Sequence, residues 1–225
     1  MIDSCYDVLV VATVKRSYGQ YCGFARALEL VGERWALLIV RDLLVGPKRF
    51  SEIQRGLPGI PTNILTARLN ELEDSGLVRR RLLERPAKGV VYELTDDGRA
   101  LEEPVVALGR WGAQYLGDPR PDETVTEDSI AMALRTTFRP EAARKTKVTY
   151  LLRLGPIEVN ARVRDGNVVV GRGPIEKPDL VIETGPAMRL LMAHEVTPAE
   201  AIRKRLVKIT GDPKLLQRFV EMFRI

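Results

Sequence analysis

The sequence predicts an α+β protein built from two parts, because the spacing of its apolar residues changes once along the chain. Up to about residue 118, apolar residues recur mainly at three- and four-residue steps, which is typical of helices. From residue 148 onward they alternate with polar residues, which is typical of half-buried strands. Residues 119–126, with the run Asp118-Pro-Arg-Pro-Asp-Glu123, predict a linker between them. We therefore expect one domain over residues 1–118 and a second over residues 127–225.

Composition excludes several functional classes. Apolar residues make up 45% of the chain and charged residues 29%, which is ordinary for a soluble globular protein. The two cysteines, Cys5 and Cys22, and the single histidine, His194, are too few for a disulfide framework, a zinc site or a histidine-based triad. The sequence also shows no nucleophile–base pair and no phosphate-binding glycine loop. We expect no metal, no cofactor and no enzymatic activity.

The N-terminal segment gives no sign of a membrane span or a secretory signal. The apolar run Val8–Val14 is far too short to cross a bilayer. Acidic Asp3 and Asp7 precede it and Lys15 follows it, which is the reverse of a secretory signal. We therefore expect a cytoplasmic protein without a membrane partner. Residues 1–13 also differ in character from the rest of the first part, which leaves Val14 as an alternative start.

Three helices are predicted in the first part. The apolar spacing over residues 25–44 predicts a first helix, which Gly46-Pro47 ends. Ser51-Glu-Ile-Gln54 has the form of a capping box and predicts the start of a short second helix. A turn follows, and a third helix over residues 61–75 is expected to begin at Pro61, because proline has no amide proton to leave unpaired in the first turn.

The third helix has two chemically different faces. Leu65, Leu69 and Leu72 form an apolar stripe that we expect to be buried. The other face carries small or hydrogen-bonding side chains, and these suit base edges because amides pair with adenine and methyl groups contact thymine. The candidate base-reading residues are Thr62, Asn63, Thr66, Ala67 and Asn70. Arg68 borders the apolar stripe, and its guanidinium is a candidate phosphate ligand. A merely solvated helix face is the alternative explanation.

A basic hairpin follows the third helix. Residues 77–83 and 90–94 are strand-like, and the loop that joins them carries Arg85 and Lys88. These two residues are candidate contacts to backbone phosphates or to the minor groove. The run Arg79-Arg80-Arg81 is more typical of a solvated strand face. Within residues 46–88, nine basic residues face five acidic ones, and this local excess favours a polyanionic partner.

Helices, turn and hairpin in this order predict a winged helix-turn-helix, which places one helix in the major groove of DNA. A further helix over residues 96–116 carries Leu108, Trp111 and Tyr115 on one side. Such flanking helices often pair across a two-fold axis, which matches palindromic operators. We therefore predict a homodimeric transcription regulator that binds double-stranded DNA and reads a palindrome with helix 61–75 and a basic wing.

Residues 22–112 resemble the HxlR family of bacterial winged-helix regulators. The resemblance rests on Cys22, on Trp35 and on sequence blocks in a fixed order, namely Gly46-Pro-Lys-Arg-Phe-Ser-Glu-Ile53, Leu65-Thr-Ala-Arg-Leu-Asn-Glu-Leu-Glu-Asp-Ser-Gly-Leu77, Tyr92-Glu-Leu-Thr-Asp-Asp-Gly98 and Trp111-Gly112. It implies a homodimer whose third helix enters the major groove and whose wing reaches the flanking backbone. It also implies control of nearby genes.

Some members of that family sense oxidants or electrophiles through the cysteine that matches Cys22. Sensing requires an accessible thiolate with a low pKa. We expect Arg26, one helical turn further on, to lower the pKa of Cys22. Gly23-Phe24 replaces the Pro-Val that usually follows in the family, and a packing role for Cys22 is the alternative. Cys5 is a candidate resolving partner.

The second part is predicted to be a strand meander followed by helices. Alternation over residues 148–154 and 157–164 predicts two strands, and Asp165-Gly166 predicts a hairpin turn. A strand over 179–182, helices near 186–193 and 198–205, a strand over 206–210 and a last helix over 214–223 follow. His194, after a helix, is expected to cap that helix or lie at the surface.

The stretch from Asp179 to Asp212 resembles the sterol-carrier-protein fold, through the order of its elements and the positions of Asp179, Ile209, Gly211 and Asp212. That resemblance implies a sheet and helices that enclose an apolar tunnel for a small apolar ligand. Methionine and aromatic side chains suit such ligands because they adapt to loose shapes. The candidate tunnel residues are Met188, Leu191, Met192, Leu215, Phe219 and Phe223. Simple core packing is the alternative for each.

Two functions follow from these patterns. The first is a DNA-binding regulator that an apolar ligand or a stress signal modulates. The second is a carrier of lipid or acyl ligands whose winged helix serves only for dimerisation. The regulator should prefer a specific DNA duplex, whereas the carrier should bind acyl ligands and show no such preference.

Overall fold

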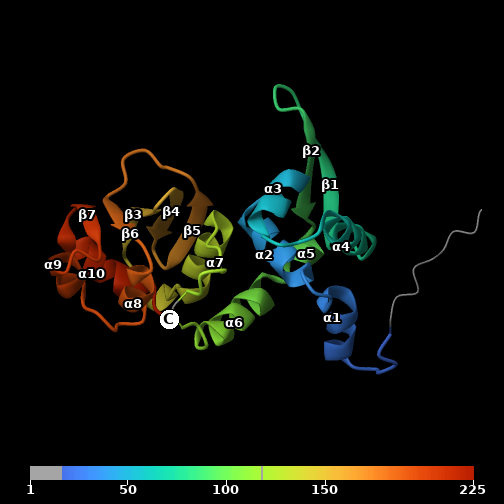
Figure 1. Cartoon of the computed structure of the whole chain (residues 1–225), viewed down its shortest axis with the longest axis horizontal. Coiled ribbons are helices and arrows are strands. Elements are labelled where there is room, and N and C mark those ends of the chain that lie inside the picture. Colours follow the sequence, from blue (N-terminus) through green and yellow to red (C-terminus); the bar gives the residue numbers. More distant parts are fainter. Residues whose placement is uncertain (1–16, 118) are drawn as a thin grey trace, which may run out of the picture.

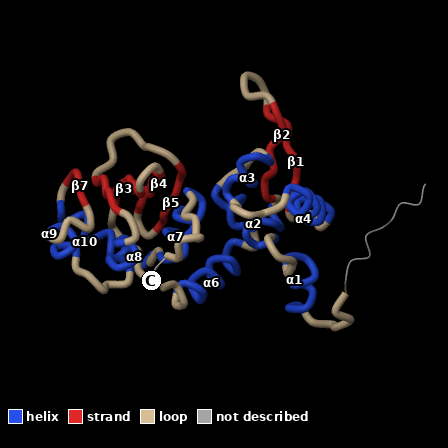
Figure 2. The backbone as a smooth tube through the Cα atoms, in the orientation of Figure 1, coloured by secondary structure: helices blue, strands red, loops and turns tan. Residues whose placement is uncertain are grey.

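The computed structural model describes residues 17–117 and 119–225, which we call the first half and the second half (Figure 1). Cys5, Val14 and the other residues up to 16 lie outside the described part. The first half is a cluster of helices from which a two-stranded hairpin projects (Figures 1 and 2). Its elements are α1 (Gly23–Val31), α2 (Ala36–Val45), α3 (Phe50–Gly56), α4 (Thr62–Asp74), β1 (Val78–Leu83), β2 (Gly89–Leu94), α5 (Asp96–Arg99) and α6 (Glu102–Ala113).

Two of the predicted helices are each divided in the structure. The prediction of one helix over residues 25–44 is wrong, because the chain leaves helical geometry between Gly32 and Trp35. Glycine is a poor helix former, and Trp35 adopts a left-handed φ of 80° that no helix continues through. The predicted helix over 96–116 is likewise divided into α5 and α6 at Ala100-Leu101.

The start of α3 also differs from the prediction. The helix begins at Phe50, so Ser51 lies inside the helix and does not cap it. The carboxylate of Glu52 accepts a hydrogen bond of 2.6 Å from the backbone N–H of Arg49, which satisfies a donor at the helix start. Pro61 is the residue just before α4, whose first helical residue is Thr62.

The hairpin has the predicted strands. Its register pairs Val78 with Leu94 and Leu83 with Gly89, and the side chains at the base of the hairpin, Val78, Val91 and Leu94, are buried. Lys48, between α2 and α3, joins the hairpin through a bridge to Tyr92. The wing is therefore tied to the helix-turn-helix by backbone hydrogen bonds as well as by the core.

The second half contains one five-stranded sheet and helices that pack on it. Its elements are α7 (Glu127–Thr137), a 3-10 turn η1 (Pro140–Ala143), β3 (Lys147–Leu154), β4 (Ile157–Arg164), β5 (Asn167–Arg172), β6 (Leu180–Thr184), α8 (Ala187–Met192), α9 (Pro198–Arg203), β7 (Lys208–Gly211) and α10 (Pro213–Met222). The strand order is β5-β4-β3-β6-β7, and only the β3–β6 pair is parallel among these strands. Asp165 and Gly166 both have positive φ, as a tight hairpin requires, so that turn prediction is confirmed.

Helix α7 joins the two halves and was not predicted. Thr126 caps it, since its hydroxyl accepts from the N–H of Ser129 while the Ser129 hydroxyl accepts from the N–H of Thr126. Glu127 and Asp128 follow in the first turn, where the helix dipole favours negative charge. The helix packs on β4 and β5 on one side and on α2 and α6 on the other (Figure 1).

Each half has its own apolar core. Leu65, Leu69 and Leu72 of α4 are buried in the core of the first half, as predicted. In the second half, Tyr150 of β3 is fully buried against Phe219 and Phe223. Among the described residues, no helix combines the length and the apolar character that crossing a membrane requires.

Candidate nucleic-acid interface

Helix α4 presents its polar face to solvent. Thr62, Asn63, Thr66 and Asn70 are exposed and Ala67 is half-buried, whereas the leucines of the same helix are buried. Because residues three and four apart share one side of a helix, these five residues form one accessible strip. The structure therefore brings the predicted base-reading residues together.

Several of these side chains form hydrogen bonds within the first half. The Thr62 hydroxyl accepts from Gln54 Nε2 at 2.7 Å, and the Thr66 hydroxyl donates to the Thr62 carbonyl at 2.9 Å. Asn70 Oδ1 accepts from Arg80 of the wing at 3.0 Å. Asn70 therefore links α4 to β1, while Asn63 is an exposed amide in the first turn of α4.

Arg68 differs from its predicted role. Its guanidinium forms ion pairs with Glu33 and with Glu71, and its side chain is 16% exposed. Two carboxylates that compete for one guanidinium leave it poorly placed to bind a phosphate. Arg68 instead connects the loop before α2 to α4 and helps to fix the orientation of α4.

The tip of the wing carries the predicted basic residues. Arg85 and Lys88 are exposed in the loop between β1 and β2, which extends away from the body of the domain (Figure 1). Arg49 was not singled out from the sequence, although it belongs to the same surface. Its Nη2 donates to the Lys88 carbonyl at 2.6 Å, and it thereby connects α3 to the wing loop.

The arginine run of β1 is mostly neutralised. Arg79 and Arg81 bind Glu93 at 2.9 and 2.8 Å, and Arg80 binds Glu73 at 2.9 Å. The hydrogen bond from Arg81, followed by that from Arg79, lowers the pKa of Glu93. These pairs agree with the expectation of a solvated strand face and leave Arg85 and Lys88 as the basic tip of the wing.

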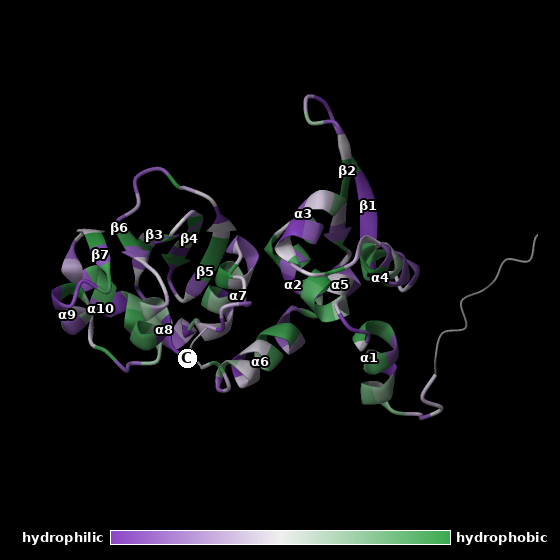
Figure 3. Cartoon of the chain, in the orientation of Figure 1, coloured by the Kyte–Doolittle hydropathy of each residue, from purple (hydrophilic) through white to green (hydrophobic). Residues whose placement is uncertain are grey.

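Exposed apolar side chains lie on α1 and, separately, on α6 with the residues just after it. Phe24 of α1 and Leu108, Trp111 and Tyr115 of the α6 segment are exposed, and the rings of Trp111 and Tyr115 meet edge to face at 5.1 Å. Figure 3 shows green, apolar residues on both helices, with α6 on the side of the second half and α1 apart from it on the opposite side of the first half. Large exposed apolar patches usually mark an interaction surface.

Cys22 lies at the residue before α1 and is exposed. The backbone N–H groups of Ala25 and then of Phe24, at the start of α1, lower the pKa of its thiol. The predicted role of Arg26 is wrong, because Arg26 does not contribute to this lowering of the pKa, and its guanidinium binds Glu29 at 2.6 Å. These backbone N–H groups, and not Arg26, therefore stabilise the thiolate of Cys22.

The six candidate tunnel residues are packed against one another and their neighbours. Met188, Leu191, Met192, Phe219 and Phe223 are buried, and Leu215 is half-buried. The rings of Phe219 and Phe223 stack at 4.7 Å. This arrangement is what simple core packing predicts. His194 is exposed with a positive φ of 58°, and its Nε2 lies 2.9 Å from the Val220 carbonyl.

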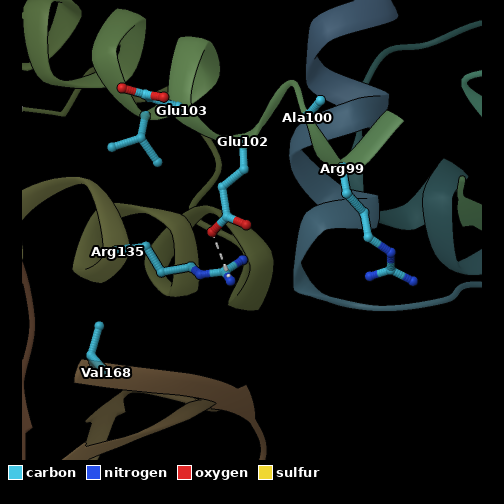
Figure 4. A pocket seen from close by; sticks show the side chains of 7 residues that line it. Arg99, Ala100, Glu102, Glu103, Arg135 and Val168 are labelled. Atoms are coloured by element: carbon cyan, nitrogen blue, oxygen red, sulfur yellow. Dashed lines mark ion pairs between the residues drawn. The ribbon is translucent and has the colours of Figure 1, made fainter. Parts of the chain in front are cut away.

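An open pocket of about 540 Å³ lies instead between the two halves (Figure 4). Its lining is largely polar and comes from α5, α6, α7 and β5: Arg99, Ala100, Glu102, Glu103, Val106, Arg135 and Val168. Arg135 donates to the Leu44 carbonyl at 2.9 Å and binds Glu102 at 2.9 Å, so it contributes to the contact between the halves. The described residues contain no group of three histidine, cysteine or acidic side chains arranged to hold a metal.

The helices α2–α4 with the β1–β2 hairpin define a winged helix-turn-helix domain. Residues 30–119 match the model of the HxlR-like helix-turn-helix family. The HTH-type transcriptional regulator YodB of Bacillus subtilis is 38% identical over 102 residues, which cover 45% of this chain and 88% of YodB. The chain belongs to the HxlR-like helix-turn-helix family.

Two further similarities concern the same part of the chain. An uncharacterized HTH-type transcriptional regulator of Mycobacterium tuberculosis is 45% identical over 97 residues, or 43% of this chain, and the chain spans only 60% of that relative. The solved structure of the redox regulator HypR in its reduced form is 33% identical and covers 41% of this chain and 92% of HypR, with a TM-score of 0.39.

Proposed function

We propose that this protein is a transcription regulator that binds double-stranded DNA as a homodimer. Helix α4 enters the major groove, and Arg85 and Lys88 at the tip of the wing contact the flanking backbone or the minor groove. The observation that carries the proposal is the exposed polar strip of α4 beside a projecting basic loop, in a chain of the HxlR-like family. Amide and hydroxyl groups serve base recognition, whereas point charges serve phosphate binding.

The exposed apolar surface of α1 and α6 supports the homodimer. A symmetric dimer buries the same patch from both copies, and aromatic residues contribute most of the affinity at such interfaces. Phe24, Trp111 and Tyr115 are of this kind and are exposed. A two-fold dimer presents two α4 helices in opposite orientations, which fits a palindromic operator.

The roles of α4 and the wing are tested by two pairs of substitutions. Asn63→Ala and Thr66→Ala remove groups proposed to read bases, so we expect them to lower affinity for the operator by about tenfold and to leave random duplex unaffected. Arg85→Ala and Lys88→Ala remove phosphate contacts, so we expect similar losses on both duplexes and a shallower salt dependence. Fluorescence anisotropy titrations at two salt concentrations measure both effects.

Glu84→Gln is the matched control, because it changes an exposed acidic side chain of the wing loop without removing a positive charge. Equal losses on operator and random DNA for all four substitutions would contradict the division between base reading and phosphate binding. Absence of any operator preference, together with tight binding of an acyl ligand, would favour the carrier function.

Modulation by an apolar ligand or by a stress signal is part of the proposal and is tested separately. A ligand between the sheet and α10 would have to displace the contacts of Phe219 and Phe223, so its binding should change the melting temperature of the second half. Displacement of a fluorescent fatty acid by unlabelled acyl ligands measures such binding. Cys22 is the proposed group for an oxidant or electrophile, since its thiol is exposed and its pKa is lowered.

A further inference from the structure

Lys48 is a fully buried lysine at the junction between helix-turn-helix and wing. It follows α2 and precedes α3 by two residues. Its backbone N–H donates to the Tyr92 carbonyl at 3.0 Å, and the Tyr92 N–H donates to the Lys48 carbonyl at 2.7 Å. A displacement of Lys48 therefore moves the wing strand and the start of α3 together.

The ammonium group of Lys48 is bound by the second half of the chain. Its Nζ donates to Oδ1 of Asp128, in the first turn of α7, at 2.8 Å, and the exposed fractions of the two side chains are 0% and 7%. Arg172 of β5 lies 3.7 Å from the same oxygen. A buried ammonium requires a compensating charge, because the cost of desolvation is otherwise not offset. The compensating carboxylate comes from a residue 80 positions further along the chain.

The surroundings of this pair are crowded. A Cβ atom added to Gly56, at the end of α3, would lie 2.7 Å from Oδ2 of Asp42 and 3.5 Å from Oδ2 of Asp128. Asp42 of α2 is itself fully buried and binds Arg41 at 2.7 Å. Asp128 therefore lies close to Gly56 at the end of α3 and is bonded to Lys48, two residues before the start of α3.

We propose that Asp128 is a positioning residue for DNA reading: through Lys48, this residue of the second half fixes the wing and α3 relative to α4. The inference rests on the proposed function, because it assigns the second half a role in the same DNA-binding site. Without the carboxylate, the Lys48 ammonium gains free energy by moving toward water, and it takes with it the backbone that is bonded to Tyr92. Any change in the second half that moves α7 therefore reaches the wing.

A double-mutant cycle tests whether Asp128 acts through Lys48. Asp128→Asn leaves the buried Lys48 ammonium without its carboxylate, and we expect it to raise the Kd for the operator by about tenfold. Lys48→Met has no ammonium to move toward water, so the double variant is expected to bind the operator more tightly than Asp128→Asn alone. A double variant that binds as weakly as Asp128→Asn or more weakly, or wild-type affinity in Asp128→Asn, would overturn the proposal.

Glu127→Gln is the matched control. It removes a carboxylate from the same first turn of α7, and hence the same favourable charge at the helix start, without touching Lys48. We expect wild-type operator affinity for this variant. A tenfold loss in Glu127→Gln would show that the effect arises from α7 as a helix and not from the pair.

A second readout needs no DNA. Amide hydrogen exchange of Tyr92 and Lys48, followed by NMR in the free protein, should become faster in Asp128→Asn, while the amides of Leu65 and Leu69 in α4 keep their protection. Unchanged exchange at Tyr92 would contradict the inference even if the wild-type protein showed no operator preference. Operator preference tests only the proposed function, whereas hydrogen exchange at Tyr92 tests only the positioning role of Asp128. Failure of one proposal can therefore be told from failure of the other.

Asp128→Glu serves if Asp128→Asn does not fold at the temperature of the assay. It keeps the charge and moves the carboxylate by one methylene, so that the pair is displaced but not removed. We expect faster exchange at Tyr92 and a smaller loss of operator affinity in the same direction. Exchange and affinity both equal to wild type in this variant would count against a positioning role.

Discussion

The two halves of the chain cover their apolar side chains to different degrees. In the second half the aromatic residues of β3 and α10 lie in one core, with Tyr150 and Phe219 fully buried. In the first half the core beneath α4 is equally well buried, yet 74% of Phe24 and 58% of Trp111 face solvent. Burial of apolar surface is the main favourable contribution to folding and association. The second half therefore buries its large aromatic side chains, whereas the first half exposes some of them, and these exposed residues are the ones we propose for contact with a second copy.

The largest effect is expected from a change in the buried core. Phe219→Ala removes a ring that stacks on Phe223 at 4.7 Å and meets Tyr150 at 5.1 Å. We expect a loss of about 3–5 kcal/mol in the free energy of unfolding of the second half. Leu82→Ala, at an exposed position of the wing, is the control and should change stability little. Chemical denaturation followed by circular dichroism measures both, and a small loss for Phe219→Ala would show that this core is loosely packed and open to ligands.

A substitution among the exposed apolar residues of the first half should weaken self-association and leave the stability of the fold unchanged. Trp111→Glu places a charge in the proposed dimer interface, and we expect it to weaken dimerisation by at least about 2 kcal/mol while the melting temperature of the monomer is unchanged. Light scattering coupled to gel filtration gives the mass. Val169→Glu, at an exposed valine of β5, is the counterpart in the second half and should leave the mass unaltered. A wild-type protein that is monomeric at all concentrations would remove the basis of this comparison.

The buried contact between the halves predicts a dependence of stability on pH. Burial, as the main cause, raises the pKa of Asp42 to about 6, and nearby Asp128 also raises it, whereas Arg41 and Lys48 lower it. The folded state therefore prefers Asp42 in its protonated form, and protonation of Asp42 stabilises the fold. This contribution is fully present below about pH 4 and is lost as the pH rises through about 6, with an upper bound of about 3 kcal/mol.

Asp42→Asn cannot titrate, so the decline of stability between pH 4.5 and 7 that Asp42 causes should be absent from this variant. Denaturation curves of wild type and variant at pH 4.5 and 7 give the change in the free energy of unfolding of each protein. Other titrating groups, such as Glu93, contribute equally to both proteins and cancel when the two changes are subtracted. Asp74→Asn, at an exposed position, is the control. Parallel pH profiles for wild type and Asp42→Asn would contradict the raised pKa of Asp42.

The smallest effect concerns the thiol at the start of α1. The amides of Ala25 and Phe24 lower the pKa of Cys22, so its alkylation by iodoacetamide should be faster at pH 7 than that of a cysteine in an unstructured peptide. Arg26→Gln should leave the rate nearly unchanged, because Arg26 binds Glu29. An alkylation rate equal to that of the peptide would indicate that Cys22 is an ordinary exposed thiol.

Much of the architecture could be predicted from the sequence because it depends on local patterns. The leucine spacing of α4, the alternation of β3 and β4 and the Asp165-Gly166 turn each report on a few neighbouring residues. The break at Gly32–Trp35 could not be predicted, because the apolar stripe continues across it and the left-handed φ of Trp35 depends on tertiary packing. Helix α7 had a signal in Thr126-Glu-Asp-Ser129, which has the form of a helix start.

The candidate site, like the fold, could be predicted from the sequence only where it depends on local spacing. Spacing alone places Asn63 and Thr66 on an exposed face of α4 and Arg85 at the tip of the wing. The partners of Arg68 come from Glu33 and Glu71, and the partner of Lys48 comes from Asp128. A charged residue has no signature in sequence that separates a solvated surface position from a buried pair with a distant partner. The contacts between the two halves are therefore visible only in the structure.

Duplex preference tests most directly whether α4 and the wing read a specific DNA. Fluorescence anisotropy compares binding to the intergenic DNA upstream of this protein's own gene with binding to a scrambled duplex of equal length at the same salt concentration. We expect nanomolar, salt-sensitive binding to the upstream DNA, tighter by about 10³-fold than to the scrambled duplex. Equal affinity for both duplexes at moderate salt would contradict site-specific reading at this locus.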